Sequence, residues 1–404
     1  MKLISIPKEK YNNYRLDAIF HCYKWDPQFL DNNTVAKHVL VLTPEEHQEL
    51  EKLTKALDKE TIQAEEFLNS NLKFTKPLAL PRKISKELRN MNNYQAQQHI
   101  RLMRYDFHPT MEGEWAISEV NSDVPGGFAE ASLLPKLAMS LFNDRPYEAK
   151  NFGDILASAI AAKVKKGGKI AMVHCTSYSD DRQVMQFLGD ELETRGFEVI
   201  YMAADHLKFK GTKAISILDG HEGEVNGIFR FTPLEWLIKM KPKNWDGYFD
   251  TLTPSCNHPI AIFAQTKRFP LVWDRLEEAG IALSTWRKLL PETTTVKAAK
   301  NKAGFIYKPA CGRVGEGISI QEACRDDEYE KIIADVKKHP KQYLAQRRFD
   351  SKPLISEEGK RYHVCLGSYC VEGQAAGYYA RISKTPRIDS FAADIPVLIE
   401  RSSQ

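Results

Sequence analysis

Residues 305–320 read Phe-Ile-Tyr-Lys-Pro-Ala-Cys-Gly-Arg-Val-Gly-Glu-Gly-Ile-Ser-Ile, so a glycine-rich loop lies between two short apolar runs. This pattern predicts a β-hairpin whose tip carries few side chains, which lets its backbone N–H groups approach an anion. Lys308 and Arg313 add the positive charge that a chain of phosphates needs. We therefore expect a lid over a nucleotide triphosphate. A surface hairpin with unrelated charges is the alternative, because glycine loops are common.

The composition is typical of a soluble protein with more than one domain. With 404 residues the chain exceeds the size at which one hydrophobic core stops growing, so two or three domains are expected. The 57 basic and 53 acidic residues nearly balance, which gives no reason to expect nucleic acid or a membrane as partner. The seven cysteines are scattered and odd in number, and neither a signal peptide nor a membrane span is indicated. We expect a cytoplasmic protein.

The order of the expected elements predicts an α/β fold. Helices are predicted over 45–70, 129–142, 180–195 and 270–290. Two strands within 100–121 are separated by a turn at 109–113, and the strands at 169–174, 197–201 and 227–231 alternate with helical segments. That alternation predicts a parallel sheet. From residue 305 onward, short alternating runs with glycine turns predict a largely antiparallel sheet over 343–348, 362–371 and 375–383.

A second cluster of chemically informative residues lies in the two strands around the 109–113 turn. Residues two apart on a strand share a face, which pairs Arg104 with Asp106, and Glu119 with Asn121. If the turn folds the strands into a hairpin, Asp106 lies opposite Glu119 and Asn121. Two carboxylates and an amide oxygen are hard ligands suited to Mg²⁺. A solvent-facing, salt-bridged hairpin is the alternative.

A third feature is Arg381, at the end of a strand predicted over 375–383. Its guanidinium could stabilise charge that develops on a transferred phosphoryl group, although a single arginine at a strand end is more often structural. The chain carries no Walker-type loop, no Gly-x-Gly-x-x-Gly, no Gly-x-Ser-x-Gly and no zinc-ligand spacing.

Taken in order, these segments resemble the synthetase domain of glutathionylspermidine synthase, within the ATP-grasp superfamily. The resemblance covers most of the chain, and its most specific pieces lie near the C-terminus. The matching segments are Tyr23-Lys-Trp-Asp26, Met103-Arg-Tyr-Asp-Phe107, Glu119-Val-Asn-Ser-Asp123, the less faithful 229–236 region, Tyr307-Lys-Pro-x-x-Gly-Arg313 and Ala376-Gly-x-x-x-Arg381. These segments taken together in order are a far stronger signal than any one of them.

The resemblance implies an ATP-dependent carboxylate–amine ligase that forms an amide or peptide bond through an acylphosphate. It implies that Asp106, Glu119 and Asn121 hold Mg²⁺, that Arg104 holds the reacting acyl-phosphate group, and that Arg381 neutralises the transferring phosphoryl group. The ATP-binding residues implied are Lys308, Lys341, Gln346, Gly312, Arg313 and Gly315. The glycine loop would close over the site and exclude water.

The fold class implied is ATP-grasp with an inserted parallel-sheet domain of Rossmann-like type. The expected domains are 1–150, with the helices and the metal-binding hairpin, 151–265, with the parallel sheet, and 266–404, with the glycine lid and the antiparallel sheet. The family's bifunctional members carry an N-terminal amidase domain, for which this chain is too short.

The substrates expected are a small, peptide-like acid and an amine. Asp123-Val-Pro-Gly-Gly127 departs from what a glutathione site would show, so the acid need not be glutathione and the amine need not be spermidine. Two alternatives remain open at this point: an ATP-binding protein without ligase activity, and a small-molecule kinase.

Overall fold

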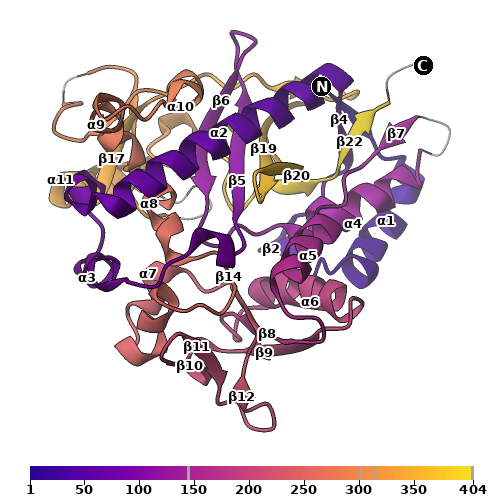
Figure 1. The fold of residues 1–404 in the computed structure, drawn as a ribbon. Coiled ribbons are helices and arrows are strands. Elements are labelled where there is room, and N and C mark those ends of the chain that lie inside the picture. The colour runs from indigo at the N-terminus through magenta and orange to yellow at the C-terminus, as the bar shows by residue number, and fades with distance from the viewer. Residues whose placement is uncertain (143–145, 301, 313–314, 316, 402–404) are drawn as a thin grey trace.

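A central antiparallel sheet organises the chain (Figure 1). The computed structural model describes residues 1–142, 146–300, 302–312, 315 and 317–401. The strands of the sheet follow the order β21 (Ala393–Ile395), β20 (Gln374–Ser383), β19 (Arg361–Val371), β5 (Leu102–Pro109) and β6 (Trp115–Asn121), and β18 (Leu354–Ile355) pairs with β19. The sheet thus joins the first third of the chain to its C-terminal end, which brings distant motifs together.

The long helix α2 (Pro44–Ser70) runs across one face of this sheet (Figure 1). Its start follows from a capping box, in which the Thr43 hydroxyl accepts from the Glu46 backbone N–H and the Glu46 carboxylate accepts from that of Thr43. Leu50, Leu57 and Ala64 recur at seven-residue spacing and are fully buried. The predicted amphipathic helix is confirmed.

The predicted hairpin at 100–121 is also confirmed. β5 and β6 pair antiparallel, with Arg104 opposite Asn121 and Asp106 opposite Glu119. A bulge follows Asp106, where the register shifts by one residue. Bulges re-aim side chains and are common beside functional sites.

The hairpin predicted for 305–320 is wrong. β16 (Phe305–Pro309) pairs instead with β17 (Tyr343–Arg347), which in turn pairs with β15 (Thr293–Thr295). Residues 318–320 form no strand, although Ser319 exchanges two hydrogen bonds with Tyr307 of β16. The more distant strand provides a full antiparallel ladder, which the short run after the loop cannot match. Helix α11 (Asp326–Lys338) lies between β16 and β17 in the chain.

A parallel sheet forms as expected from β14 (Ser255–Cys256), β13 (Gly227–Arg230), β8 (Lys169–Val173) and β9 (Glu198–Met202), in that order. Its nearby helices are α4 (Phe128–Met139), α5 (Phe152–Lys163) and α6 (Ser179–Glu193) (Figure 1). The described residues also form three further sheets. The first has the order β1 (Lys2–Ser5), β4 (His38–Leu42), β22 (Val397–Glu400) and β7 (Tyr147–Glu148). The second is formed by β10 (Leu207–Lys210), β11 (Lys213–Ser216) and β12 (Gly223–Glu224), and the third by β2 (Gln28–Phe29) and β3 (Asn32–Asn33). The three domain boundaries stay a prediction.

The helix predicted for 270–290 is interrupted. The structure has two short helices, α9 (Trp273–Glu278) and α10 (Ser284–Leu289). Gly280 separates them with φ of 88°, a left-handed conformation that ends a helix and suits glycine. The other helices are α1 (Lys8–His21), α3 (Arg82–Asn90), α7 (Leu234–Leu237) and α8 (Ile262–Gln265).

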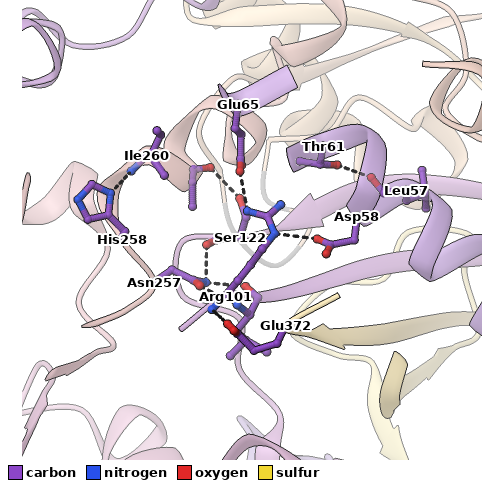
Figure 2. A network of polar contacts seen from close by, with 12 residues as sticks. Leu57, Asp58, Thr61, Glu65, Arg101, Ser122, Asn257, His258, Ile260 and Glu372 are labelled. Atoms are coloured by element: carbon purple, nitrogen blue, oxygen red, sulfur yellow. Dashed lines mark hydrogen bonds and ion pairs between the residues drawn. The ribbon is translucent and has the colours of Figure 1, made fainter. Parts of the chain in front are cut away.

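Buried polar contacts fasten α2, β5 and β14 to one another. Figure 2 shows the Arg101 guanidinium donating to Asp58 at 2.9 Å and to Glu65 at 2.5 Å, both on α2. In the same view, Asn257 donates to the backbone carbonyl of Ser122 at 2.7 Å. These contacts hold the base of the β5–β6 hairpin against the parallel sheet. Within the described residues, no helix has the length and apolarity needed to cross a bilayer.

Candidate active site

One cavity of about 600 Å³ opens between the central sheet, the β15–β17–β16 sheet and the N-terminal segment around residue 26. It collects most of the residues singled out in the sequence. Its lining includes Arg104, Asp106, Glu119, Asn121, Lys308, Gly312, Gly315 and Arg381. Side chains nearly 280 positions apart in the sequence, such as Arg104 and Arg381, therefore line the same cavity.

The carboxylate and amide groups of the β5–β6 hairpin form one hydrogen-bonded cluster. Arg104 donates to both oxygens of Asp106, at 2.8 and 3.0 Å, and Asn121 Nδ2 donates to Asp106 Oδ2 at 2.9 Å. Asn121 Nδ2 also lies 3.5 Å from Glu119 Oε1. Burial raises the pKa of Asp106, and the adjacent Arg104 guanidinium opposes that shift. The cluster is therefore compact before any ligand enters.

Gly367 makes room for the Arg104 side chain. A Cβ atom at Gly367 of β19 would lie 2.7 Å from Arg104 Cδ, so a larger residue there would displace the guanidinium. Arg104 Nη1 also donates to the Gly126 carbonyl at 2.9 Å, and its guanidinium lies 5.1 Å from the centre of the Tyr379 ring. These contacts fix the direction in which Arg104 points into the cavity.

Lys267 belongs to the site and was missed by the sequence reasoning. Its ammonium lies 2.7 Å from Glu119 Oε2 and donates to the Gly312 carbonyl at 3.1 Å. Burial alone would raise the pKa of Glu119, but Lys267 lowers it below its usual range. Lys267 follows the short helix α8 in a segment with no recognisable motif, so only the folded structure reveals it.

Lys308 is buried on β16 at the back of the cavity. Its ammonium donates to the Ser118 carbonyl at 3.4 Å. Burial lowers the pKa of Lys308 to about 8, although the nearby Glu119 carboxylate partly offsets this shift. Among the described residues this ammonium has one weak hydrogen-bond partner, so an anion in the cavity would stabilise it.

The glycine loop reaches the same cavity. Gly315 adopts φ of 68°, and a Cβ atom there would lie 2.6 Å from the Ile388 carbonyl oxygen. Only glycine fits this close approach to the Ile388 carbonyl. The predicted approach of the loop's backbone N–H groups to an anion stays a prediction. Arg313 lies outside the described residues, so its predicted contact with ATP stays a prediction.

Arg381 lies on β20, on the side of the cavity away from Lys308. Its Nη2 donates to the Asp389 carbonyl at 2.6 Å, and its Nε lies 3.7 Å from Asp394 Oδ1. The Arg381 side chain is 18% exposed, so it keeps access to the cavity.

Two predicted ATP ligands do not line this cavity. Lys341 is exposed, and its backbone carbonyl accepts from Arg268 at 3.1 Å. Gln346 lines a separate, smaller cavity behind Lys308, and its amide donates to the Thr293 hydroxyl at 3.0 Å. Asp123, considered as a substrate contact, accepts from buried Arg230 at 2.5 Å and from the Leu234 backbone N–H at 2.8 Å. Asp123 is thus engaged in joining the hairpin to the parallel sheet.

The charges test whether Mg²⁺ suits this site. Asp106, Glu119 and Asn121 supply oxygens of the right chemistry, but Arg104 and Lys267 already neutralise the two carboxylates. Lys308 and Arg381 add further positive charge on the same cavity. A divalent cation fits here together with a polyphosphate, whose negative charge offsets the excess.

An apolar part of the cavity lies beside this polar part. Ile306, Ile318, Ile320 and Phe349 line it, and the Phe349 ring lies 5.2 Å from that of His108. A flat aromatic group attached to a phosphate chain matches this division into an apolar and a charged half.

The family comparison agrees with the geometry. The family model described as glutathionylspermidine synthase preATP-grasp matches residues 10–400, nearly the whole chain. The chain belongs to this family. A search of the curated proteins finds no significant match.

Structural similarity points to the same fold. A glutathione synthetase-like effector from Globodera pallida is 12% identical, with 97% of each chain covered and a TM-score of 0.65. A putative gamma-glutamylcysteine synthetase from Methylobacillus flagellatus is also 12% identical, with 83% of this chain and 86% of that one covered and a TM-score of 0.47. The predicted fold class, α/β with ATP-grasp architecture, is confirmed.

Proposed function

We propose that this protein is an ATP-dependent carboxylate–amine ligase that joins a small, peptide-like acid to an amine through an acylphosphate. The observation that carries this proposal is the single cavity in which the Asp106–Glu119–Asn121 cluster faces Lys308 and Arg381. Phosphoryl transfer depends on positioning and on charge stabilisation, and this cavity supplies both.

The two halves of the cavity fit the two halves of ATP. The adenine would lie among Ile306, Ile318 and Phe349, and the phosphates would lie between Lys267 and Lys308. Asp106, Glu119 and Asn121 would hold Mg²⁺, which when bound neutralises phosphate oxygens. The glycine loop at Gly312 and Gly315 would cover the phosphates with backbone N–H groups.

The two arginines lie where the acid would react. Arg104 is held in place by Asp106 and the Gly126 carbonyl, and it can orient the substrate carboxylate toward the γ-phosphate. Arg381 can stabilise the negative charge on the transferring phosphoryl group. The amine then attacks the acyl carbon and phosphate leaves. A cavity that excludes water protects the acylphosphate from hydrolysis.

Phosphate release from ATP tests this proposal. The purified protein is incubated with Mg-ATP and a panel of peptide-like acids and amines. Phosphate release that requires both an acid and an amine supports the ligase. Tight ATP binding with no turnover across the panel supports a binding protein instead, and a stable phosphorylated product without an amine requirement supports a kinase. Glu119→Gln should abolish Mg-dependent turnover, and unchanged activity would remove Glu119 from the metal site.

A further inference from the structure

A cluster of charged side chains lies in the cavity beside Arg381. The Lys24 ammonium is 2.6 Å from Asp26 Oδ1, 3.2 Å from Glu130 Oε1 and 2.6 Å from Asp394 Oδ2. These residues come from the N-terminal segment, from helix α4 and from β21, and all four line the cavity. Three carboxylates thus share one ammonium.

Glu130 is the member of this cluster whose hydrogen bonding is incomplete. Its Oε1 accepts from Lys24 and, at 3.4 Å, from Gln183 Nε2. Its Oε2 is buried and has no hydrogen-bond partner among the described residues. A buried carboxylate oxygen without a donor is costly, and such exceptions occur where a ligand or a proton completes the bonding.

The surroundings of Glu130 favour proton uptake near neutral pH. Burial raises the pKa of Glu130 to about 7, with the Lys24 ammonium lowering it and the Asp394 and Asp26 carboxylates raising it further. Asp394 is also bound to the Tyr379 hydroxyl at 2.7 Å. A group with such a pKa can accept a proton and return it to water in each catalytic cycle.

The cluster also lies beside the groups proposed to hold the reacting acid. Arg381 Nε is 3.7 Å from Asp394, and the Tyr379 ring lies between Asp394 and the Arg104 guanidinium. Glu130 stands in the first turn of helix α4, three residues after Gly127, and Arg104 donates to the carbonyl of Gly126. An amine that attacks an acyl carbon held by Arg104 would enter the cavity that Glu130 also lines.

We propose that Glu130 is the general base that takes a proton from the incoming amine, with Lys24 as its positioning residue. The amine arrives as an ammonium ion, and Glu130 accepts one proton from it. The freed nitrogen attacks the acyl carbon, the C–N bond forms, and the bond from that carbon to the phosphate oxygen breaks. Phosphate leaves with the electron pair and takes the second nitrogen proton. Glu130 then returns its proton to water. This inference rests on the proposed ligase function.

The test separates the two half-reactions with the Glu130→Gln variant and hydroxylamine. Hydroxylamine is largely neutral at pH 7 and reacts with acylphosphates without a base. With an acid from the panel and Mg-ATP, Glu130→Gln should form the hydroxamate at nearly the wild-type rate. With a protonated alkylamine it should be at least about 100-fold slower than wild type. The remaining rate of Glu130→Gln with the alkylamine should rise with pH as the amine itself deprotonates. The rise in rate near pH 7, which deprotonation of Glu130 gives the wild-type protein, should be absent from its pH–rate profile.

Each result is decisive. Equal loss with hydroxylamine and with the alkylamine would make Glu130 a structural residue, and an unchanged amine rate would also overturn the proposal. Absence of hydroxamate with the wild-type protein would instead contradict the proposed ligase function itself. The control is Glu193→Gln, because Glu193 is exposed on helix α6 and away from the cavity lining.

A second measurement needs no substrate. Burial raises the pKa of Glu65, like that of Glu130, to about 7, so in protein labelled with ¹³C at glutamate carboxyl groups the decisive signal is one that titrates near pH 7 and disappears in Glu130→Gln. The variant should fold, because glutamine resembles the protonated form of Glu130. If no glutamate signal lost in the variant titrates above pH 6, Glu130 is not suited to accept the proton.

Discussion

Replacing Lys267 by methionine should weaken ATP binding by about 30-fold. The Lys267 ammonium lies 2.7 Å from Glu119, contacts the Gly312 carbonyl and shares the cavity with Lys308. A hydrogen bond to a charged group contributes about 2 kcal/mol. At 1.36 kcal/mol for each factor of ten, the loss of one such bond to a phosphate gives the stated change in Kd. Methionine keeps the length and the apolar packing of the side chain.

Calorimetric titration of the variant with Mg-ATP measures this effect. Lys341→Met is the matched control, because Lys341 is an exposed lysine that does not line the cavity, and its Kd should stay within about twofold of wild type. Circular dichroism should show that both variants are folded. The reasoning is refuted if Lys267→Met binds ATP as tightly as wild type, or if Lys341→Met loses as much affinity.

Three further changes probe other parts of the structure. Arg381→Ala should lower kcat by about 100-fold or more and leave the Kd of ATP nearly unchanged, because the contact of Arg381 with the phosphoryl group matters chiefly in the transition state. A large loss of ATP affinity with normal turnover at saturating ATP would contradict this role of Arg381. His99 is buried with its pKa lowered to about 4 by desolvation, so the unfolded chain takes up a proton first as the pH falls below about 6.5. The contribution of His99 to stability should therefore fall by about 2 kcal/mol from pH 7 to pH 5. In urea unfolding, His99→Phe should lose about 2 kcal/mol less stability over this range than the wild-type protein does. Thr43→Ala removes the cap of α2 and should cost about 1 kcal/mol in the same assay with ligase activity unchanged, whereas an unaltered midpoint would mean that the cap is unimportant.

The sequence predicts those features that depend on neighbouring residues. The β5–β6 hairpin follows from alternating runs around a turn, and its pairing places Asp106 opposite Glu119 as expected. The 45–70 helix follows from apolar residues at helical spacing. Family motifs then supply roles that no spacing rule provides.

Features that depend on distant pairing are missed. β16 was expected to pair with the run just after its loop, yet it pairs with β17, beyond an intervening helix. Lys267 enters the site because helix α8, which precedes it, packs against β6. Lys341 is exposed, and its predicted contact with ATP stays a prediction. The Lys24–Glu130 contact joins residues 106 positions apart. Local patterns carry no information about such contacts.

The origin of the oxygen in the released phosphate tests the ligase account most directly. The protein is incubated with Mg-ATP, an amine and an acid labelled with ¹⁸O in its carboxylate, and the phosphate is analysed by mass spectrometry. Attack of the carboxylate on the γ-phosphate predicts one ¹⁸O atom in each phosphate formed, in step with the amide. Phosphate without ¹⁸O, or an amide formed without phosphate release, would contradict the account.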